Sequence, residues 1–337
     1  MEPWVLRGSV LILLLALGWS IGASLRAPKA NAWAPAHRKL RVLTTILPLY
    51  DLARTMGGSD VEVRNLLPPG VDPHEFALSP HDIALVDQAD LLVTNGAGLD
   101  DFLMSAVRKA RPRDNRRIVV ASAGIPRLNA GSHEGDEGAH GESGDPHMWL
   151  DPVFARRYTK VIAAEMEGEL RDRDEGQAAT RVARRATALE DELARLDEDY
   201  RRTLAPLQGR GFIAFHGAFA YLAARYNLRI AGVWQTTPGR EPGPRDVAAL
   251  LRMARDRGVR ALLSEPQFSP RALEMIAHDA RIPVYTIDPF ETAPNLDSAD
   301  YIVTMRANLQ TLVRALGGQP SPSNAGMEAR THGRRGE

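Results

Sequence analysis

The sequence of 337 residues contains no cysteine, and its 42 basic residues balance its 42 acidic residues. The lack of cysteine excludes disulfide bonds, metal sites built from thiolates and an anchor that depends on a lipid-bearing cysteine. The lack of a basic excess argues against a protein that binds nucleic acid. What is present, 44% apolar and 25% charged residues, is the composition of a soluble globular protein. At this length the chain can bury the cores of two domains.

The N-terminus has the pattern of a secretory signal peptide. Arg7 precedes an apolar run over residues 10–23, and the small-residue triplet Ala30-Asn31-Ala32 follows the run. A basic start, an apolar centre and an A-x-A site are typical of a cleaved signal. We therefore expect residues 1–32 to be removed and the remaining chain to be soluble in the periplasm. An uncleaved inner-membrane anchor is the alternative, although the run is shorter than the roughly 20 residues of a membrane span.

Short β-branched runs alternate with helical patterns along most of the chain, which is typical of an α/β fold. We predict two α/β lobes with central sheets, at residues 38–175 and 209–316. The predicted strands are residues 41–49, 61–67, 89–96, 116–122, 211–217, 228–234, 259–265 and 282–288. The tail 317–337 is rich in Gly, Pro, Ser and charge, so we expect it to be disordered.

One long amphipathic helix is predicted over residues 177–205, between the two lobes. Apolar residues recur there at spacings of four and three: Val182, Ala186, Leu189, Leu193, Leu196 and Tyr200. This spacing places them on one helical face. At 1.5 Å per residue the helix would be about 40 Å long, enough for a stiff connector between lobes. Capping residues also mark two shorter helices, which we expect to start after Ser79 and after Asp151.

Four potential metal ligands stand where predicted strands or loops meet turn signals: His74, His147, His216 and Asp288. Ligands bind beyond the carboxyl ends of strands in open α/β sheets, so two residues from each lobe could meet in an interlobe cleft. Three imidazoles and one carboxylate suit zinc better than manganese, which prefers more oxygen. Each residue alone also has an ordinary explanation. His74 could be a polar loop residue, His216 a core histidine and Asp288 a turn-forming residue.

A polar, Gly-rich and acidic segment over residues 129–146 contains His133 and His140. Such a composition cannot build a core, so we expect a flexible loop. The two histidines are candidate accessory ligands that would collect metal weakly. A plain flexible loop without a metal role is the alternative.

Several segments resemble the periplasmic metal-binding proteins of zinc and manganese ABC importers: TTILPLYDLARTMGG, LLPPGVDPHEF, DPHMWLDP, FHGAFAYLAARYNL and LLSEPQFSP. The resemblance extends from about Arg41 to about Leu316. It implies that His74, His147, His216 and Asp288 are the ligands, in two lobes joined by one long helix. A histidine at the third ligand position, here His216, is commoner in the family's zinc binders, whereas manganese binders typically have glutamate there.

The resemblance therefore implies a zinc-binding protein, not an enzyme, that delivers Zn²⁺ to a membrane permease with its cytoplasmic ATPase. A manganese-binding protein of the same importer class is the alternative. We expect a monomer. Because zinc binds neutral imidazole, its affinity should fall as the pH drops below the usual histidine pKa of about 6.5.

A secreted zinc hydrolase is the rival from another functional class, with Glu75 or Glu265 as the general base. A catalytic zinc keeps an open position for water, which Asp288 would fill, and the sequence has no His-Glu-x-x-His motif. An anchored adhesin or structural protein would leave the ligands at the strand ends unexplained.

Overall fold

The computed structural model describes residues 39–319, apart from residues 72, 75, 110–115, 129–143, 236–242, 257 and 268–270. The described residues belong to one compact unit. The predicted signal peptide, the accessory residues His133 and His140, Glu75 and the tail from residue 320 lie outside the described residues. Within the described part, no helix combines the length and the apolar character needed to span a membrane.

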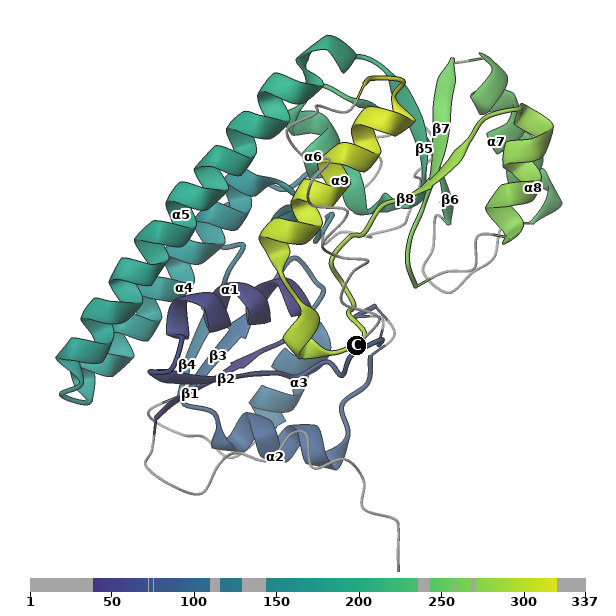
Figure 1. Cartoon of the computed structure of the whole chain (residues 1–337). Coiled ribbons are helices and arrows are strands. Elements are labelled where there is room, and N and C mark those ends of the chain that lie inside the picture. The colour runs from purple at the N-terminus through teal and green to yellow at the C-terminus, as the bar shows by residue number, and fades with distance from the viewer. Residues whose placement is uncertain are drawn as a thin grey trace, which may run out of the picture. The chain divides into compact units, whose positions relative to one another are not determined.

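In the N-terminal half, the described residues form a four-stranded parallel sheet with the order β2-β1-β3-β4 (Figure 1). The strands are β1 (Leu40–Thr44), β2 (Val61–Asn65), β3 (Leu91–Thr94) and β4 (Arg117–Val120). Val42 of β1 pairs with Val63 on one side and with Leu91 on the other. All four residues of β3 are buried, as expected for an inner strand of a parallel sheet.

The helices of this half are α1 (Leu47–Gly57), α2 (Pro80–Gln88), α3 (Asp101–Lys109) and α4 (Pro152–Asp172). The first strand is shorter than predicted, because Pro48 stands in the first turn of α1, where proline fits better than in a strand. Both predicted caps are confirmed. Ser79 and Asp82 form a reciprocal capping box on α2, and the Asp151 side chain accepts a hydrogen bond from the backbone of α4.

The long helix between the two halves is confirmed as α5 (Gly176–Leu204). Its 29 residues correspond to about 44 Å. The six residues of the predicted apolar stripe are all buried. They face a continuous hydrophobic core, and α5 packs against α4, α1 and α9 (Figure 1). A short 3-10 turn at Ala205–Leu207 then leads into the second sheet.

The second sheet is also parallel and four-stranded within the described residues, with the order β6-β5-β7-β8. Its strands are β5 (Gly211–His216), β6 (Arg229–Gln235), β7 (Val259–Ser264) and β8 (Val284–Thr286). The helices are α6 (Ala220–Arg225), α7 (Pro244–Asp256), α8 (Arg271–Ala280) and α9 (Tyr301–Ala315). Side chains of successive β5 residues point to opposite faces of the sheet and pack in two different hydrophobic clusters. Phe212 belongs to the core that continues into α5, and Phe215 packs in a second cluster with residues of α7 and α8.

The C-terminal helix α9, which the sequence analysis did not single out, joins the two halves. It packs against α5 and α1 as well as against β7 and β8. At its start, the Tyr301 backbone N–H donates to Asp51 of α1 at 2.8 Å, and the Tyr301 hydroxyl donates to the Trp149 carbonyl at 2.5 Å. Trp149 in turn donates from Nε1 to the carbonyl of Pro289 at 2.9 Å. These bonds fasten the segment after β8 to the N-terminal half.

Candidate metal centre

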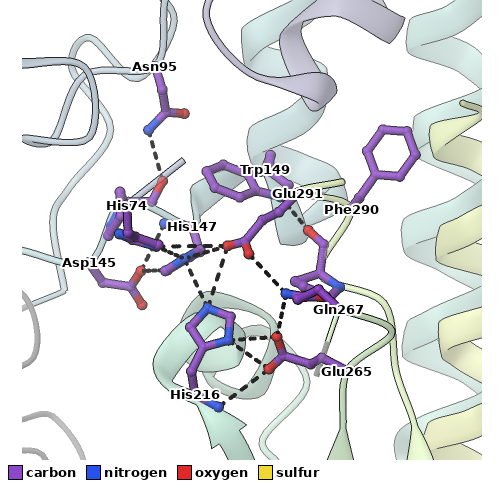
Figure 2. Close-up of polar contacts among 12 residues, drawn as sticks. His74, Asn95, Asp145, His147, Trp149, His216, Glu265, Gln267, Phe290 and Glu291 are labelled. Atoms are coloured by element: carbon purple, nitrogen blue, oxygen red, sulfur yellow. Dashed lines mark hydrogen bonds and ion pairs between the residues drawn. The ribbon is translucent and has the colours of Figure 1, made fainter. Parts of the chain in front are cut away.

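Four side chains from the two halves converge on one point: His74, His147, His216 and Glu291. One potential ligand atom from each lies within 4.8 Å of the others. Figure 2 shows the three imidazole rings and the Glu291 carboxylate turned toward one another. The structure thus brings together three of the four predicted ligands and adds a glutamate that the sequence analysis did not select.

The ends of secondary-structure elements position these side chains. His216 is the last residue of β5, and His147 directly precedes a short 3-10 helix, η2 (Met148–Leu150). His74 lies in the connection from β2 to α2, and Glu291 follows β8. His147, His216 and Glu291 are buried, whereas the His74 side chain is 14% exposed. His74 is therefore the group through which solvent comes nearest to the centre.

Four of five distances between the ligand atoms lie near those of a tetrahedral site, and the one from Glu291 to His74 is longer. His147 Nε2 lies 3.3 Å from Nε2 of His74 and 3.3 Å from Nε2 of His216. Glu291 Oε1 lies 3.0 Å from His147 Nε2, 3.5 Å from His216 Nε2 and 3.9 Å from His74 Nε2. With bonds of about 2.0–2.1 Å to zinc, tetrahedral ligand atoms stand about 3.3 Å apart. The cluster can therefore enclose a zinc ion with little rearrangement.

The inner oxygen of Glu291 is the clearest sign that this cluster needs a cation. Oε1 is buried and makes no hydrogen bond of good geometry with any described residue. Its nearest polar neighbours are the imidazole nitrogens of His147 and His216, at 3.0 and 3.5 Å, and these offset its lost hydration only when they carry protons. A positive ion at the centre of the cluster would satisfy this oxygen.

Two further carboxylates orient the imidazole rings. Asp145 Oδ1 lies 2.7 Å from His147 Nδ1, and the two oxygens of Glu265 lie 2.7 and 2.8 Å from His216 Nδ1. A carboxylate at Nδ1 keeps the proton on that nitrogen and leaves the Nε2 lone pair free for a metal. The sequence analysis considered Glu265 only as the general base of a hydrolase. In the structure it supports His216 instead.

The charges of neighbouring groups shift the pKa values of the two buried histidines and of Glu291. Burial lowers the pKa of His147 and His216, but the facing carboxylates outweigh burial and raise the pKa of both above the usual histidine value. Burial raises the pKa of Glu291, but the imidazoles of His216 and His147 outweigh it and hold this pKa well below its usual range. Each proton on an imidazole is thus favoured by the glutamate charge, and a bound divalent ion would take the place of such protons.

Asp288, the carboxylate selected from the sequence, lies outside this group. Its Oδ1 accepts a hydrogen bond from the Phe290 backbone N–H at 2.7 Å, and burial raises its pKa to about 6. Phe290 has a φ of 59°, which is unusual for a bulky residue. The Asp288 side chain therefore shapes the turn that presents Glu291, which agrees with the turn-forming alternative.

Of the predicted flexible segment 129–146, only residues 144–146 lie among the described residues. Residues 144–146 are buried, and Asp145 binds both the ring and the backbone N–H of His147. Asp145 was not a candidate residue. The sequence Asp145-Pro146-His147 is a signal that could have identified Asp145, because it places a carboxylate two residues before a proposed ligand.

The chain matches one family model over residues 42–315, that of ZnuA, described as zinc-uptake complex component A, periplasmic. The high-affinity zinc uptake system protein ZnuA of Bacillus subtilis is 29% identical over 287 residues, which cover 82% of this chain and 88% of that protein. The zinc-binding protein AdcA of Streptococcus pyogenes is 26% identical over 294 residues. That match covers 82% of this chain but 56% of AdcA, so the chain spans about half the length of this relative.

Solved structures share the fold. The SBP FpvC of Pseudomonas aeruginosa, solved in complex with Mn²⁺, superposes with a TM-score of 0.71 at 25% sequence identity. The match covers 83% of this chain and 99% of FpvC. The arrangement of two parallel sheets around a long helix is therefore common to both proteins.

Proposed function

This chain belongs to the ZnuA family of periplasmic zinc-uptake components, and we propose that it captures one Zn²⁺ ion for an ABC importer. The proposed ligands are Nε2 of His74, His147 and His216, and Oε1 of Glu291. The observation that carries the proposal is the convergence of these four atoms within 4.8 Å of one another, one of them a buried carboxylate oxygen with no hydrogen-bond partner among the described residues. The family comprises solute-binding proteins, not enzymes.

The donor set favours zinc. Three imidazole nitrogens and one carboxylate oxygen suit zinc, whereas manganese prefers sites with more oxygen. With Glu291 ionised, the ion and its four ligands have a formal charge of +1 instead of +2, and the Asp145 and Glu265 carboxylates lie behind two of the imidazoles, so the cost of enclosing the ion is lower than with a neutral shell. Manganese is the second candidate, and it is supported by the Mn²⁺ complex of the structurally similar FpvC.

A hydrolase fits this arrangement less well. A catalytic zinc keeps one position for water and needs a nearby general base. Here Glu291 faces the point where that water would bind, and Glu265 is held by His216 Nδ1 at 2.7 Å. Capture of the ion, without chemistry on a substrate, agrees with both contacts.

The partners follow from family membership. We infer that the loaded protein docks on a membrane permease that works with a cytoplasmic ATPase, and that the protein acts as a monomer in the periplasm. The basic, apolar and A-x-A pattern of residues 1–32 supports export and cleavage. His133 and His140 stay proposed as weak accessory ligands, on the composition of their segment.

The test is the zinc content and affinity of the secreted protein, compared between wild type and His216→Ala. An apparent binding free energy of about 10–16 kcal/mol for four-ligand zinc sites corresponds to about 3 kcal/mol per ligand, or roughly a hundredfold in affinity. Wild type should hold one equivalent of zinc, and His216→Ala should bind it about a hundredfold more weakly. The matched control is His278→Ala, since the His278 side chain is 89% exposed on α8. Equal affinity of His216→Ala and wild type would contradict the proposal.

A further inference from the structure

Gln267 lies between two carboxylates of the metal centre, in the connection directly after β7. Its Nε2 donates to Glu265 Oε2 at 3.0 Å and to Glu291 Oε2 at 3.3 Å, as Figure 2 shows. A primary amide carries two N–H groups, so one nitrogen can serve both glutamates. Gln267 therefore links the proposed ligand Glu291 to the residue that orients His216.

This contact makes the two oxygens of Glu291 unequal. Oε2 accepts from Gln267, whereas Oε1 faces the imidazoles without a hydrogen-bond partner among the described residues. A carboxylate held in this way offers one oxygen to an ion. Together with three imidazole nitrogens it supplies four donors, the number that zinc prefers. Release of Oε2 would allow a fifth bond and a more oxygen-rich shell, which suits manganese better.

A neutral donor is well suited to this position. Glu265 and Glu291 are both buried carboxylates, and the same amide nitrogen lies 3.0 and 3.3 Å from them. The amide of Gln267 bonds both carboxylates and adds no charge. A lysine there would also offset the repulsion between them, but its positive charge would oppose a cation at the centre.

We propose that Gln267 is a positioning residue that restricts Glu291 to one metal–oxygen bond and thereby favours Zn²⁺ over Mn²⁺. The inference rests on the proposed function, because it requires Glu291 as a ligand. Gln267 does not bind the ion. It acts through the glutamate that it holds.

The test compares wild type with Gln267→Met, which has a similar length but lacks the donor, and with Gln267→Glu, which has the same shape and likewise cannot donate when ionised. Gln177→Met, at an exposed position near the start of α5, is the matched control. Two quantities are measured: the ratio of zinc to manganese affinity by competitive titration, and the visible absorption of the Co²⁺-loaded protein. Tetrahedral Co²⁺ absorbs far more strongly than five- or six-coordinate Co²⁺, so the spectrum reports coordination number directly.

We expect both Gln267 variants to lower the zinc-to-manganese affinity ratio by at least about tenfold, on the scale of outer-shell substitutions at metal sites. Their Co²⁺ absorption should weaken, and the control should behave like wild type. A Gln267 variant that binds zinc with the wild-type ratio and the wild-type Co²⁺ spectrum would overturn the inference and leave the proposed function intact. Equal weakening of both metals with an unchanged spectrum would overturn it as well. Failure of wild type itself to bind zinc would refute the proposed function, and this inference with it.

Discussion

The identity of the fourth ligand can be decided by two substitutions that each remove one negative charge, Glu291→Gln and Asp288→Asn. The first neutralises the oxygen that faces the three imidazoles. In the protein, Asp288 Oδ1 accepts a hydrogen bond from the Phe290 N–H at 2.7 Å. The amide oxygen of Asn in the second variant can still accept this bond. The two variants therefore separate a direct bond to the ion from support of the turn.

The expected difference is large. One donor of a four-ligand zinc site corresponds to about 3 kcal/mol, or roughly a hundredfold in affinity. Glu291→Gln also raises the formal charge of the ion with its four ligands from +1 to +2, so we expect a loss of at least about a hundredfold. Asp288→Asn should change zinc affinity less than about threefold, which is below about 0.7 kcal/mol.

The assay is a competitive titration against a chromogenic zinc chelator near neutral pH, with thermal unfolding of each metal-free variant as the check on folding. Loss of zinc binding in folded Asp288→Asn that equals or exceeds the loss in Glu291→Gln would refute our reasoning. It would restore Asp288 as the ligand, as the sequence analysis expects.

Three more predictions concern the support of the ligands, the pH dependence and the stability of the fold. Asp145→Ala should weaken zinc binding by about 10- to 100-fold, because His147 loses the carboxylate that fixes its tautomer, and an unchanged affinity in the same titration would contradict this role. As the pH is lowered, zinc affinity should begin to fall before pH ~6.5 is reached, because the pKa values of His147 and His216 are raised and protons compete with the ion. A constant affinity between about pH 8 and pH 6 would be inconsistent with the structure. Asp60→Asn should lower the free energy of unfolding by about 1 kcal/mol near neutral pH, since Asp60 forms partly exposed ion pairs with Arg181 and Arg185 of α5. Because the hydrogen bond from Arg181 lowers the pKa of Asp60 from 3.8 to about 2, this contribution is present above 3.8 and is lost as the pH falls through about 2. A denaturation difference that persists at lower pH would contradict the assignment.

The sequence is informative about the fold where burial imposes a regular pattern. The stripe from Val182 to Tyr200 predicts α5 because a helix packed along one side buries every third or fourth residue. Runs such as residues 91–94 predict inner strands because both faces of a parallel sheet are buried. Tertiary contacts matter more for α9, which is held between the halves by bonds from Tyr301 to Asp51 and Trp149.

The sequence is less informative about the metal centre, because turn geometry decides which carboxylate points inward. Three histidines could be selected because turn signals and strand ends surround them. The strand-end rule favours Asp288, whereas in the structure Glu291 lies beside the three imidazoles, after a turn that begins at Asp288. That turn depends on the left-handed backbone of Phe290 and on the bond from Trp149 to Pro289. Neither can be read from local preferences, since a phenylalanine rarely adopts that conformation and Trp149 lies far away in the chain.

The most direct test of the central claim is the position of zinc in a crystal of the metal-loaded protein, found by anomalous scattering at the zinc absorption edge. We predict one strong peak at about 2.0–2.2 Å from Nε2 of His74, His147 and His216 and from Oε1 of Glu291. Zinc bonded to Asp288 in place of Glu291, or no zinc among the three imidazoles, would contradict the account.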